Sequence, residues 1–514
     1  MKNVKQIMTD RNRVICTADA VNHENSPAWT KPDSELLEQF AMTGTLGNSF
    51  YAGAKENTEN AVELLERCDA SAIASAIVKG RNEGFIRTFP LLGLVFLSKK
   101  DPEQFKAVFS QVVKTGNDLG DFIDLCKSMR GLGRSVKSAI SAWITYNTSD
   151  YYAQKYRRQI ADAVRLVRFK GDSDPIFGYV LSGYGTRVKG WSAEKEQAAY
   201  EKYPNLKAHR DFIAAIEAGE NTAALSILKE HKLDVDSLTA CYDKFDAAIW
   251  REIARLSPVM RFIKYLDKFD RAGVFLRDIK LAEEKMSVAN FQAAKVFPFR
   301  LYTAYANISN PAVKNHLAAV LDEYTAAYDW SAFNAYSWAV CPDVSGSMSG
   351  VCSGSLTFSD IAGMFTGFFA KGIKDCRIIP WSDRVFKWDV PRNDSIITHI
   401  RKIKHLDGGT DMSCALRSLT AGNIRRDFLV FITDTEEYGR RYRNGSSWID
   451  AWIEYRKRVN PRAGAFILRA DSYTTNPFPE KEAKKYDIYP IYGWNDNVIK
   501  YMQYIVKNSC RQGE

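Results

Sequence analysis

In its second half the chain reads Trp338-Ala339-Val340-Cys341-Pro342-Asp343-Val344-Ser345-Gly346-Ser347. The apolar start predicts a buried strand, and the small residues after it let the backbone turn sharply. The carboxylate of Asp343 and the hydroxyls of Ser345 and Ser347 then stand at alternate positions, so their oxygens can converge on one point. Oxygen ligands of this kind suit a hard divalent cation. The stretch therefore predicts a strand of an α/β sheet with a metal site at its tip.

Later segments supply further oxygens. Gly408-Gly409-Thr410-Asp411 opens a helix-like stretch, and Phe428-Leu429-Val430-Phe431-Ile432-Thr433-Asp434 is a second apolar strand that ends in a carboxylate. In a parallel α/β sheet the strand tips and the loops after them converge on one edge. Taken alone, the first turn is better interpreted as an ordinary Ser/Gly turn that caps a helix. Together the segments predict a metal site made of Asp343, Ser345, Ser347, Thr410 and Asp434, with Mg²⁺ the expected ion and Mn²⁺ or Ca²⁺ as alternatives.

The region around these segments alternates in pattern. Strand-like runs at 336–342, 376–381, 428–433 and 464–468 are interleaved with helical stretches at 357–371, 393–404, 411–419, 448–458 and 495–507. This alternation is typical of βαβ units. We therefore expect a doubly wound α/β domain over residues 331–514.

The first part of the chain has a different character. From about residue 33 to residue 330, helical patterns follow one another, for example at 59–68, 70–79, 85–99, 102–115, 122–129, 135–146 and 152–169. Such an array predicts paired helices stacked as a degenerate α-solenoid. Residues 1–30 are polar and predict a mobile or peripheral arm. The predicted domains are 1–30, 31–330 and 331–514, in a multidomain α plus α/β protein.

Bulk properties narrow the class of protein. With 514 residues, 46% hydrophobic and 26% charged, the chain is long enough for two or three globular domains. Its longest apolar stretch, 89–97, is too short to cross a bilayer, and the N-terminus lacks the apolar core of a secretion signal. The nine cysteines show no metal or disulfide spacing, which favours reduced thiols and a cytoplasmic location without membrane contact.

Positive charge is concentrated in one segment. The net charge is +10, and residues 127–170 contain ten Lys or Arg against two acids. If 152–169 is one helix, its arginines share roughly a quadrant, and its apolar residues lie together on another side. Arginine's planar fork matches phosphate oxygens and stacks on bases, so this surface predicts nucleic-acid binding. A solvated face paired with acids elsewhere is the alternative. The predicted RNA-binding residues are Arg130, Arg134, Lys137, Lys155, Arg157, Arg158, Arg165, Arg168 and Lys170.

The predicted metal set resembles the metal-ion-dependent adhesion site (MIDAS) of von Willebrand factor A domains, in which Asp-x-Ser-x-Ser is followed by a Thr and an Asp. The chain as a whole, over roughly residues 30–514, resembles the Ro autoantigen family of TROVE-domain ribonucleoproteins, and most of all a bacterial Ro orthologue. The segments that support this are 44–51 (Gly-Thr-Leu-Gly-Asn-Ser-Phe-Tyr), 131–134 (Gly-Leu-Gly-Arg), 165–170 (Arg-Leu-Val-Arg-Phe-Lys), 297–299 (Phe-Pro-Phe) and 343–348.

The resemblance implies a specific architecture and set of partners. HEAT-like helical repeats close into a ring whose ends are joined by the A-type domain. Small structured Y RNAs bind the basic outer surface, and single-stranded 3′ ends of misfolded RNAs enter the central hole. A 3′-to-5′ exoribonuclease is a further implied partner, and the protein itself is expected to be a monomer within a ribonucleoprotein. One departure is Arg168, since family members often have a His in that segment.

No catalytic signature accompanies these features. The chain has no Gly-x-x-x-x-Gly-Lys phosphate loop, no His-Glu-x-x-His and no nucleophile elbow. A phosphatase of the aspartyl-nucleophile type needs a carboxylate where Ser345 stands. We therefore expect no intrinsic catalysis. The alternative to RNA binding is a protein-binding scaffold in which the metal accepts an acidic residue from a partner.

Overall fold

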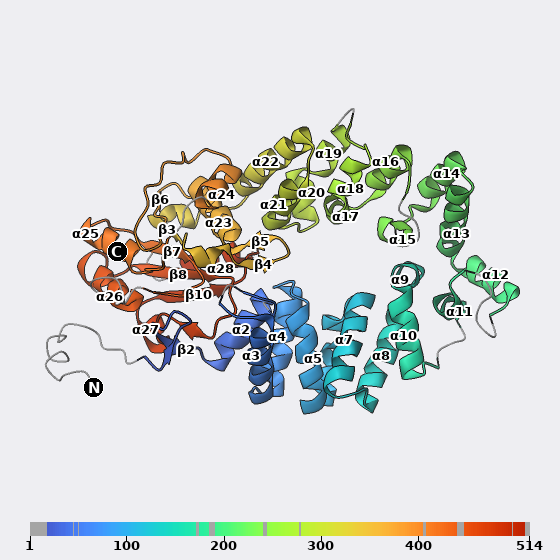
Figure 1. The fold of residues 1–514 in the computed structure, drawn as a ribbon, viewed down its shortest axis with the longest axis horizontal. Helices are drawn as coiled ribbons and strands as arrows, with labels where there is room; N and C mark the ends of the chain where they lie inside the picture. The colour runs from blue at the N-terminus through green and yellow to red at the C-terminus, as the bar shows by residue number, and fades with distance from the viewer. Residues whose placement is uncertain are drawn as a thin grey trace. The chain divides into compact units, whose positions relative to one another are not determined.

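A computed structural model describes residues 18–44, 46–49, 51–170, 174–184, 191–239, 244–276, 279–404, 408–438, 447–495 and 497–508. The chain forms two compact units (Figure 1). The α/β unit combines Met1–Leu64 with Leu321–Glu514, and the helical unit is Leu65–Val320. The units therefore divide the chain differently from the predicted boundaries, because the first 64 residues group with the C-terminal part. In the described residues no helix has the length and apolarity needed to span a membrane.

The helical unit is built from short helices, most of them amphipathic, as the sequence predicts. Its helices, the first and last of which extend into the α/β unit, are α3 (Ala54–Arg67), α4 (Ala70–Asn82), α5 (Thr88–Lys100), α6 (Pro102–Val112), α7 (Gly116–Met129), α8 (Arg134–Asn147), α9 (Asp150–Lys155), α10 (Arg157–Val167), α11 (Pro175–Ser182), α12 (Ala193–Lys202), α13 (Pro204–Glu217), α14 (Asn221–His231), α15 (Val235–Thr239), α16 (Ala247–Leu256), α17 (Val259–Lys264), α18 (Leu266–Arg271), α19 (Lys280–Lys285), α20 (Val288–Ala293), α21 (Pro298–Asn307) and α22 (Pro311–Ala326).

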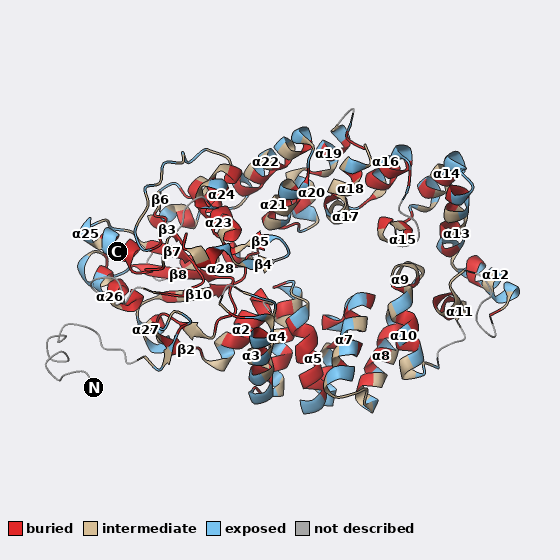
Figure 2. Cartoon of the chain, viewed as in Figure 1, coloured by how far each residue is buried: buried red, intermediate tan, exposed pale blue. Residues whose placement is uncertain are grey.

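Helix α5 forms the centre of the first helices in this unit. It is apolar all round and buried from Phe89 to Ser98, and α4, α6 and α7 pack against it (Figure 2). A helix without a polar face is stable only when neighbours cover it. Local signals set the ends of those neighbours. Asp101 caps α6 with Pro102 in its first turn, and Thr115 and Asp118 form a capping box at the start of α7.

The predicted single helix over 152–169 is wrong. The chain breaks at Tyr156 (φ −119°, ψ 27°) into α9 and α10, and Arg168 ends α10 in a left-handed conformation with φ 54°. The buried Tyr156 ring lies against Gly116, where an added Cβ would meet Tyr156 Cβ at 2.3 Å. This packing, which no helical periodicity reveals, favours the break.

The α/β unit contains the predicted parallel sheet. Its strands and helices are β1 (Ala20–Val21), β2 (Pro27–Thr30), α2 (Asp33–Thr43), η1 (Phe333–Ala335), β3 (Trp338–Pro342), η2 (Gly346–Ser349), β4 (Val351–Ser353), β5 (Leu356–Thr357), α23 (Phe358–Gly372), β6 (Cys376–Ile378), α24 (Ile396–Lys404), α25 (Cys414–Ala421), β7 (Phe428–Ile432), α26 (Trp448–Arg458), β8 (Gly464–Arg469), β9 (Thr475–Asn476), α27 (Glu480–Lys485), β10 (Ile488–Tyr492) and α28 (Asn497–Asn508).

The main sheet has the strand order β10-β8-β7-β3-β6, and every pairing is parallel. Alternate residues point to opposite faces. On one face Ala339, Leu429 and Ile467 join a core with α25 and α26. On the other face the rings of Trp338, Phe428 and Phe466 pack together, and α23 covers this side. Both faces are therefore buried, as a doubly wound domain requires.

The structure differs from the sequence predictions at both margins of this sheet. Strand β10 was not predicted, because Pro490 interrupts its pattern; the strand lies at the sheet edge, where proline is tolerated. The predicted arm 1–30 is also not peripheral over its described part. Residues 18–30 contain β1 and β2, and β2 pairs with β9 through Trp29 and Asn476.

Candidate metal centre and nucleic-acid interface

The predicted metal residues lie at the carboxyl edge of the sheet. Asp343 follows β3 and Asp434 follows β7, and these strands are neighbours, with the Asp343 N–H donating to the Ile432 carbonyl at 2.9 Å. Ser345 and Ser347 occupy the turn after Asp343, with their hydroxyl oxygens 3.2 Å apart. Asp343 and Asp434 thus follow the tips of adjacent strands, as the sequence predicted.

The loop that bears Thr410 joins this edge through its backbone. The Gly346 N–H donates to the Gly408 carbonyl at 3.1 Å, which holds residues 408–411 against the turn after β3. Thr410 is buried, and the Tyr438 N–H donates to its carbonyl at 2.7 Å. All five predicted residues therefore lie in buried segments of this edge.

The carboxylates of the site lack balancing positive charge. Asp343 accepts from the Ser345 N–H at 2.8 Å and from the Thr433 hydroxyl at 2.7 Å, yet its burial raises its pKa to about 6. Burial, and then the charge of Asp343, raise the pKa of Asp434 well above its usual range. Asp434 Oδ2 is buried without a hydrogen-bond donor among the described residues. Two buried carboxylates, one with an unsatisfied oxygen, and three hydroxyls fit a divalent cation.

The backbone after β7 is unusual as well. Thr435 has φ 61°, a conformation that is strained for a β-branched residue, and such strain is concentrated at functional sites. No group of three or more His, Cys, Asp or Glu side chains is arranged to hold a metal ion in the parts of the chain that the structure describes. The candidate centre, with two carboxylates, therefore relies on hydroxyls for its remaining protein ligands.

Residues from the N-terminal segment cover this edge, which sequence reasoning missed. The His23 N–H donates to Glu436 Oε2 at 2.8 Å, and His23 Nδ1 lies 3.3 Å from Glu436 Oε1. The hydrogen bond to Glu436 raises the pKa of His23. The His23 ring stacks on Tyr51 at 5.7 Å and packs against Tyr473 at 4.8 Å. Hydrogen bonds of the Tyr51 side chain to Glu24 and Ser347 place it at the candidate ligands.

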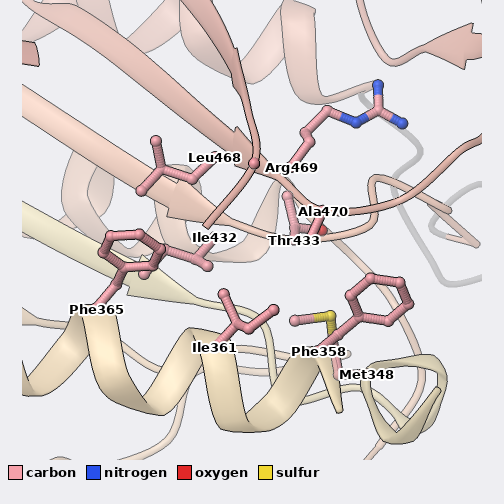
Figure 3. Close-up of a pocket in the computed structure, with 10 residues that line it drawn as sticks. Met348, Phe358, Ile361, Phe365, Ile432, Thr433, Leu468, Arg469 and Ala470 are labelled. Atoms are coloured by element: carbon pink, nitrogen blue, oxygen red, sulfur yellow. The ribbon is translucent and has the colours of Figure 1, made fainter. Parts of the chain in front are cut away.

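The space beneath the site is filled by apolar side chains. Phe358, Ile361 and Phe365 of α23 face Ile432 and Leu468 of the strands (Figure 3). The cavity they leave is about 10 Å³, which is no larger than a single water requires. It is therefore packing that supports the strand tips, and no ligand pocket.

Most of the predicted basic residues lie on helices α7, α8 and α10 or directly after them, and α10 packs against both α7 and α8. Helices α7 and α10 run parallel, because Gly116 meets Tyr156 and Gly120 meets Gln159 near their starts, and Gln159 Nε2 donates to Asn117 at 3.0 Å. Both helices advance 1.5 Å per residue, so their C-terminal ends also lie at one level. Helix α8 begins there, only a few residues after α7 ends.

Cations from three helices lie at this common end. We call it the basic helix end, formed by Lys127, Arg130, Arg134, Arg165, Arg168 and Lys170. Arg134, Arg168 and Lys170 are exposed and make no ion pair with any residue that the structure describes. Lys127 and Arg165 make only exposed pairs one helical turn away, with Asp124 and Asp162. Exposed pairs of this kind leave a cation available to a polyanion.

The remaining predicted residues do not all belong to this end. Lys137 is half-buried in the second turn of α8, and Arg157 donates to the Val180 carbonyl at 3.3 Å. Arg158 is exposed on the same face as Arg165, about 10 Å along α10. Lys155 is the clear exception, because its ammonium lies 2.5 Å from Asp236 with only 18% of its side chain exposed. It is a structural partner of Asp236 and no free cation.

Lys99 was missed by sequence reasoning. It is exposed near the end of α5, and its ammonium donates to the Met129 carbonyl at 3.4 Å, beside the basic helix end. Arg130 also reaches α5, where it donates to the Ser98 hydroxyl. The signal was present, since Lys99 and Lys100 stand together at the end of a long apolar run, but they lie outside the segment of highest charge.

Fold and sites together define a protein with an all-helical unit and a parallel α/β unit, whose sheet has carboxylates and hydroxyls at its carboxyl edge. No family model matches the chain. It is similar to the RNA-binding protein RO60 of Deinococcus radiodurans, with 23% identity over 300 residues, or 53% of each chain. The alignment thus spans about half the length of that curated relative.

The similarity in fold covers more of the chain than the similarity in sequence. The crystal structure of the Deinococcus radiodurans RO (RSR) protein superposes with a TM-score of 0.63, covering 93% of this chain and 99% of that chain at 17% identity. The resemblance to bacterial Ro proteins that the sequence motifs predicted is therefore confirmed.

Proposed function

We propose that this protein binds small structured RNA through the basic helix end and has no catalytic activity of its own. The observation that supports this most is the gathering of exposed cations from α7, α8 and α10 at one level, with Arg134, Arg168 and Lys170 free of ion pairs among the described residues. Such a surface neutralises phosphates, which provide most of the affinity of proteins for nucleic acids. The similar protein from Deinococcus radiodurans is named as RNA-binding.

The resemblance to the Ro family extends this proposal. We propose that the RNA is a Y-like non-coding RNA, that HEAT-like repeats close into a ring joined by the A-type domain, and that single-stranded 3′ ends of misfolded RNA enter its hole. We further propose that the protein is a monomer within a cytoplasmic ribonucleoprotein and that it assists a 3′-to-5′ exoribonuclease. All cysteines in the described part of the chain are free thiols, in keeping with a reducing compartment.

The salt dependence of binding tests the RNA surface. Arg134→Gln with Arg168→Gln should weaken binding of a labelled stem–loop RNA with a single-stranded 3′ tail. It should also lower the slope of log K against log salt by about 0.9 per lost phosphate contact. Lys229→Gln with Lys244→Gln is the matched control, since both are exposed lysines elsewhere in the helical unit. An unchanged slope in the arginine variant would contradict the assignment.

We also propose that Asp343, Ser345, Ser347, Thr410 and Asp434 hold one divalent cation, with Mg²⁺ the first candidate and Mn²⁺ or Ca²⁺ as alternatives. The unbalanced buried carboxylates support this. The ion would supply a positive charge beside Asp343 and Asp434, neither of which forms an ion pair among the described residues. Equilibrium dialysis with Mn²⁺ should detect one site in the protein and none in Asp343→Ala; retained binding in that variant would exclude the assignment.

The alternative, a scaffold whose metal accepts an acidic residue from a partner, has less support. Tyr51 and His23 already lie over the carboxyl edge, so an outside carboxylate would have to displace them. Metal removal should therefore leave RNA capture intact and lower thermal stability. Loss of a bound protein partner on chelation would favour the scaffold instead.

A further inference from the structure

The α/β unit has a basic surface of its own, in addition to the basic helix end of the helical unit. It lies at the amino edge of the main sheet, opposite the candidate metal centre. Trp338 of β3 aligns with Cys376 of β6 and Phe428 of β7, and Phe428 aligns with Gly464 of β8. The segments that precede these strands therefore share one edge. Its cations, which we call the amino-edge set, are Lys374, Arg377, Arg392, Arg425, Arg426, Arg456, Lys457, Arg458 and Arg462.

Hydrogen bonds and an ion pair connect these residues across the edge. Arg392 Nη1 donates to the Lys374 carbonyl at 2.9 Å, on the β6 side. Arg426 Nη1 pairs with Asp375 at 2.9 Å, which bridges the β6 and β7 sides. Asn460 Nδ2 then donates to the Arg426 carbonyl at 2.8 Å. The side chain of Asn460 also accepts from the Arg462 N–H at 3.2 Å, which reaches β8. The set is thus continuous from one strand to the next.

Much of this charge is not neutralised. The acids at the same edge are Asp375, Asp394, Asp427, Glu454 and Asp487, five against nine cations. Arg377, Arg425, Lys457 and Arg462 are exposed and make no ion pair within the described part of the chain. Among the described residues, the Arg392 guanidinium donates to the carbonyl oxygens of Lys374 and Lys371 and forms no ion pair, which leaves its full charge in place.

Ordinary structural roles explain part of the set. Lys457 and Arg458 stand in the last turn of α26, where cations offset the negative end of the helix dipole. Arg377 lies on the edge strand β6, where a charge discourages pairing with another sheet. Neither role applies to Arg425 and Arg462, which stand in segments before the interior strands β7 and β8. Both side chains are exposed directly before neighbouring strands, where they are available to bind a partner molecule.

We propose that the amino edge is a second RNA surface, which binds the phosphate backbone through Arg425 and Arg462. This rests on the proposed RNA-binding function. RNA is favoured over an acidic protein because most of the set is arginine, whose planar fork binds phosphate oxygens in bidentate fashion. The edge lies on the α/β unit, whereas the basic helix end lies on the helical unit.

The test compares two double variants of the full-length protein. Arg425→Gln with Arg462→Gln removes the proposed contacts and keeps polar side chains. Lys481→Gln with Lys500→Gln makes the same charge change at exposed positions in the first turns of α27 and α28. The probe is the labelled stem–loop RNA with a 3′ tail, titrated at several salt concentrations. Thermal melting of each variant checks that the fold is kept.

The arginine pair should lower the slope of log K against log salt by roughly 2, near 0.9 for each phosphate contact, while the lysine pair leaves it unchanged. Cross-linking of RNA containing 4-thiouridine to peptides that include Arg425 or Arg462 is the second expected result. A wild-type slope in the folded variant, together with no such cross-link in the wild-type protein, would overturn the second surface, while loss of slope in Arg134→Gln with Arg168→Gln would still support the first. If the wild-type protein does not bind the RNA at all, the proposed function fails with it.

Discussion

His399 is fully buried in the α/β unit, with its ring stacked on Trp388 at a centroid distance of 5.6 Å. Burial and the nearby charge of Lys371 lower its pKa to about 4, although Asp394 opposes this. Between the unfolded pKa near 6.5 and a folded pKa near 4, only the unfolded chain takes up the proton. Stability should therefore fall as the pH drops through this window.

Replacing His399 tests this directly. In His399→Phe this loss of stability at acid pH should disappear. The difference in unfolding free energy between variant and wild type should therefore shift by roughly 2 kcal/mol in favour of the variant from about pH 8 to about pH 5. Urea unfolding at both pH values measures this change. A constant difference between variant and wild type at the two values would show that His399 does not titrate in this way.

Asp434 gives a second prediction at this scale. Its burial beside Asp343, with one oxygen lacking a donor among the described residues, should make the metal-free protein less stable than a neutral amide would. Asp434→Asn should thus raise metal-free stability by about 1–3 kcal/mol and abolish the stabilisation that Mg²⁺ confers. The neighbouring Asp411→Asn is the control, because Asp411 is paired with Arg417 and its loss should destabilise with or without metal. Equal melting shifts for both variants would contradict this account.

At the scale of elements, the parallel packing of α7 on α10 depends on two glycines with different surroundings. A Cβ on Gly116 would meet Tyr156 Cβ at 2.3 Å, whereas a Cβ on Gly120 would meet the flexible Gln159 side chain at 3.2 Å. Gly116→Ala should therefore destabilise by about 1–3 kcal/mol through overpacking. Gly120→Ala should be neutral, or stabilise by up to about 1 kcal/mol through helix propensity. Chemical unfolding measures both, and similar losses would argue against this packing.

The same elements show which features a sequence reveals. The order of apolar runs and helices predicted β3, β6, β7 and β8, and hence the adjacency of Asp343 and Asp434, because parallel strands bring their tips together. The break at Tyr156 was not predictable, since it depends on the absent side chain of a glycine on another helix. Likewise, the pairing of Lys155 with Asp236 joins residues 81 apart, which charge patterns along one segment do not reveal.

At the scale of the whole molecule, the α/β unit is discontinuous in sequence. Its N-terminal segment is fixed by buried polar contacts to the C-terminal part. Lys31 Nζ donates to the Tyr473 carbonyl at 2.6 Å, and Glu35 accepts from Tyr492 at 2.6 Å and from Asn476 at 2.9 Å. Buried contacts of this kind are costly to break. The α/β unit therefore requires both ends of the chain to fold.

The candidate metal centre lies where these two ends meet, so metal binding should tighten the N-terminal segment. Asn22 donates to the Glu437 carbonyl at 2.8 Å and His23 bonds Glu436, both in the loop after Asp434. A cation that orders this loop should slow amide exchange over residues 20–31 as well as 433–437, because the two segments share hydrogen bonds. Exchange measured with Mg²⁺ and after chelation tests this, and α5 of the helical unit serves as the internal reference. Protection of residues 433–437 alone would show that metal binding is not coupled to the N-terminal segment.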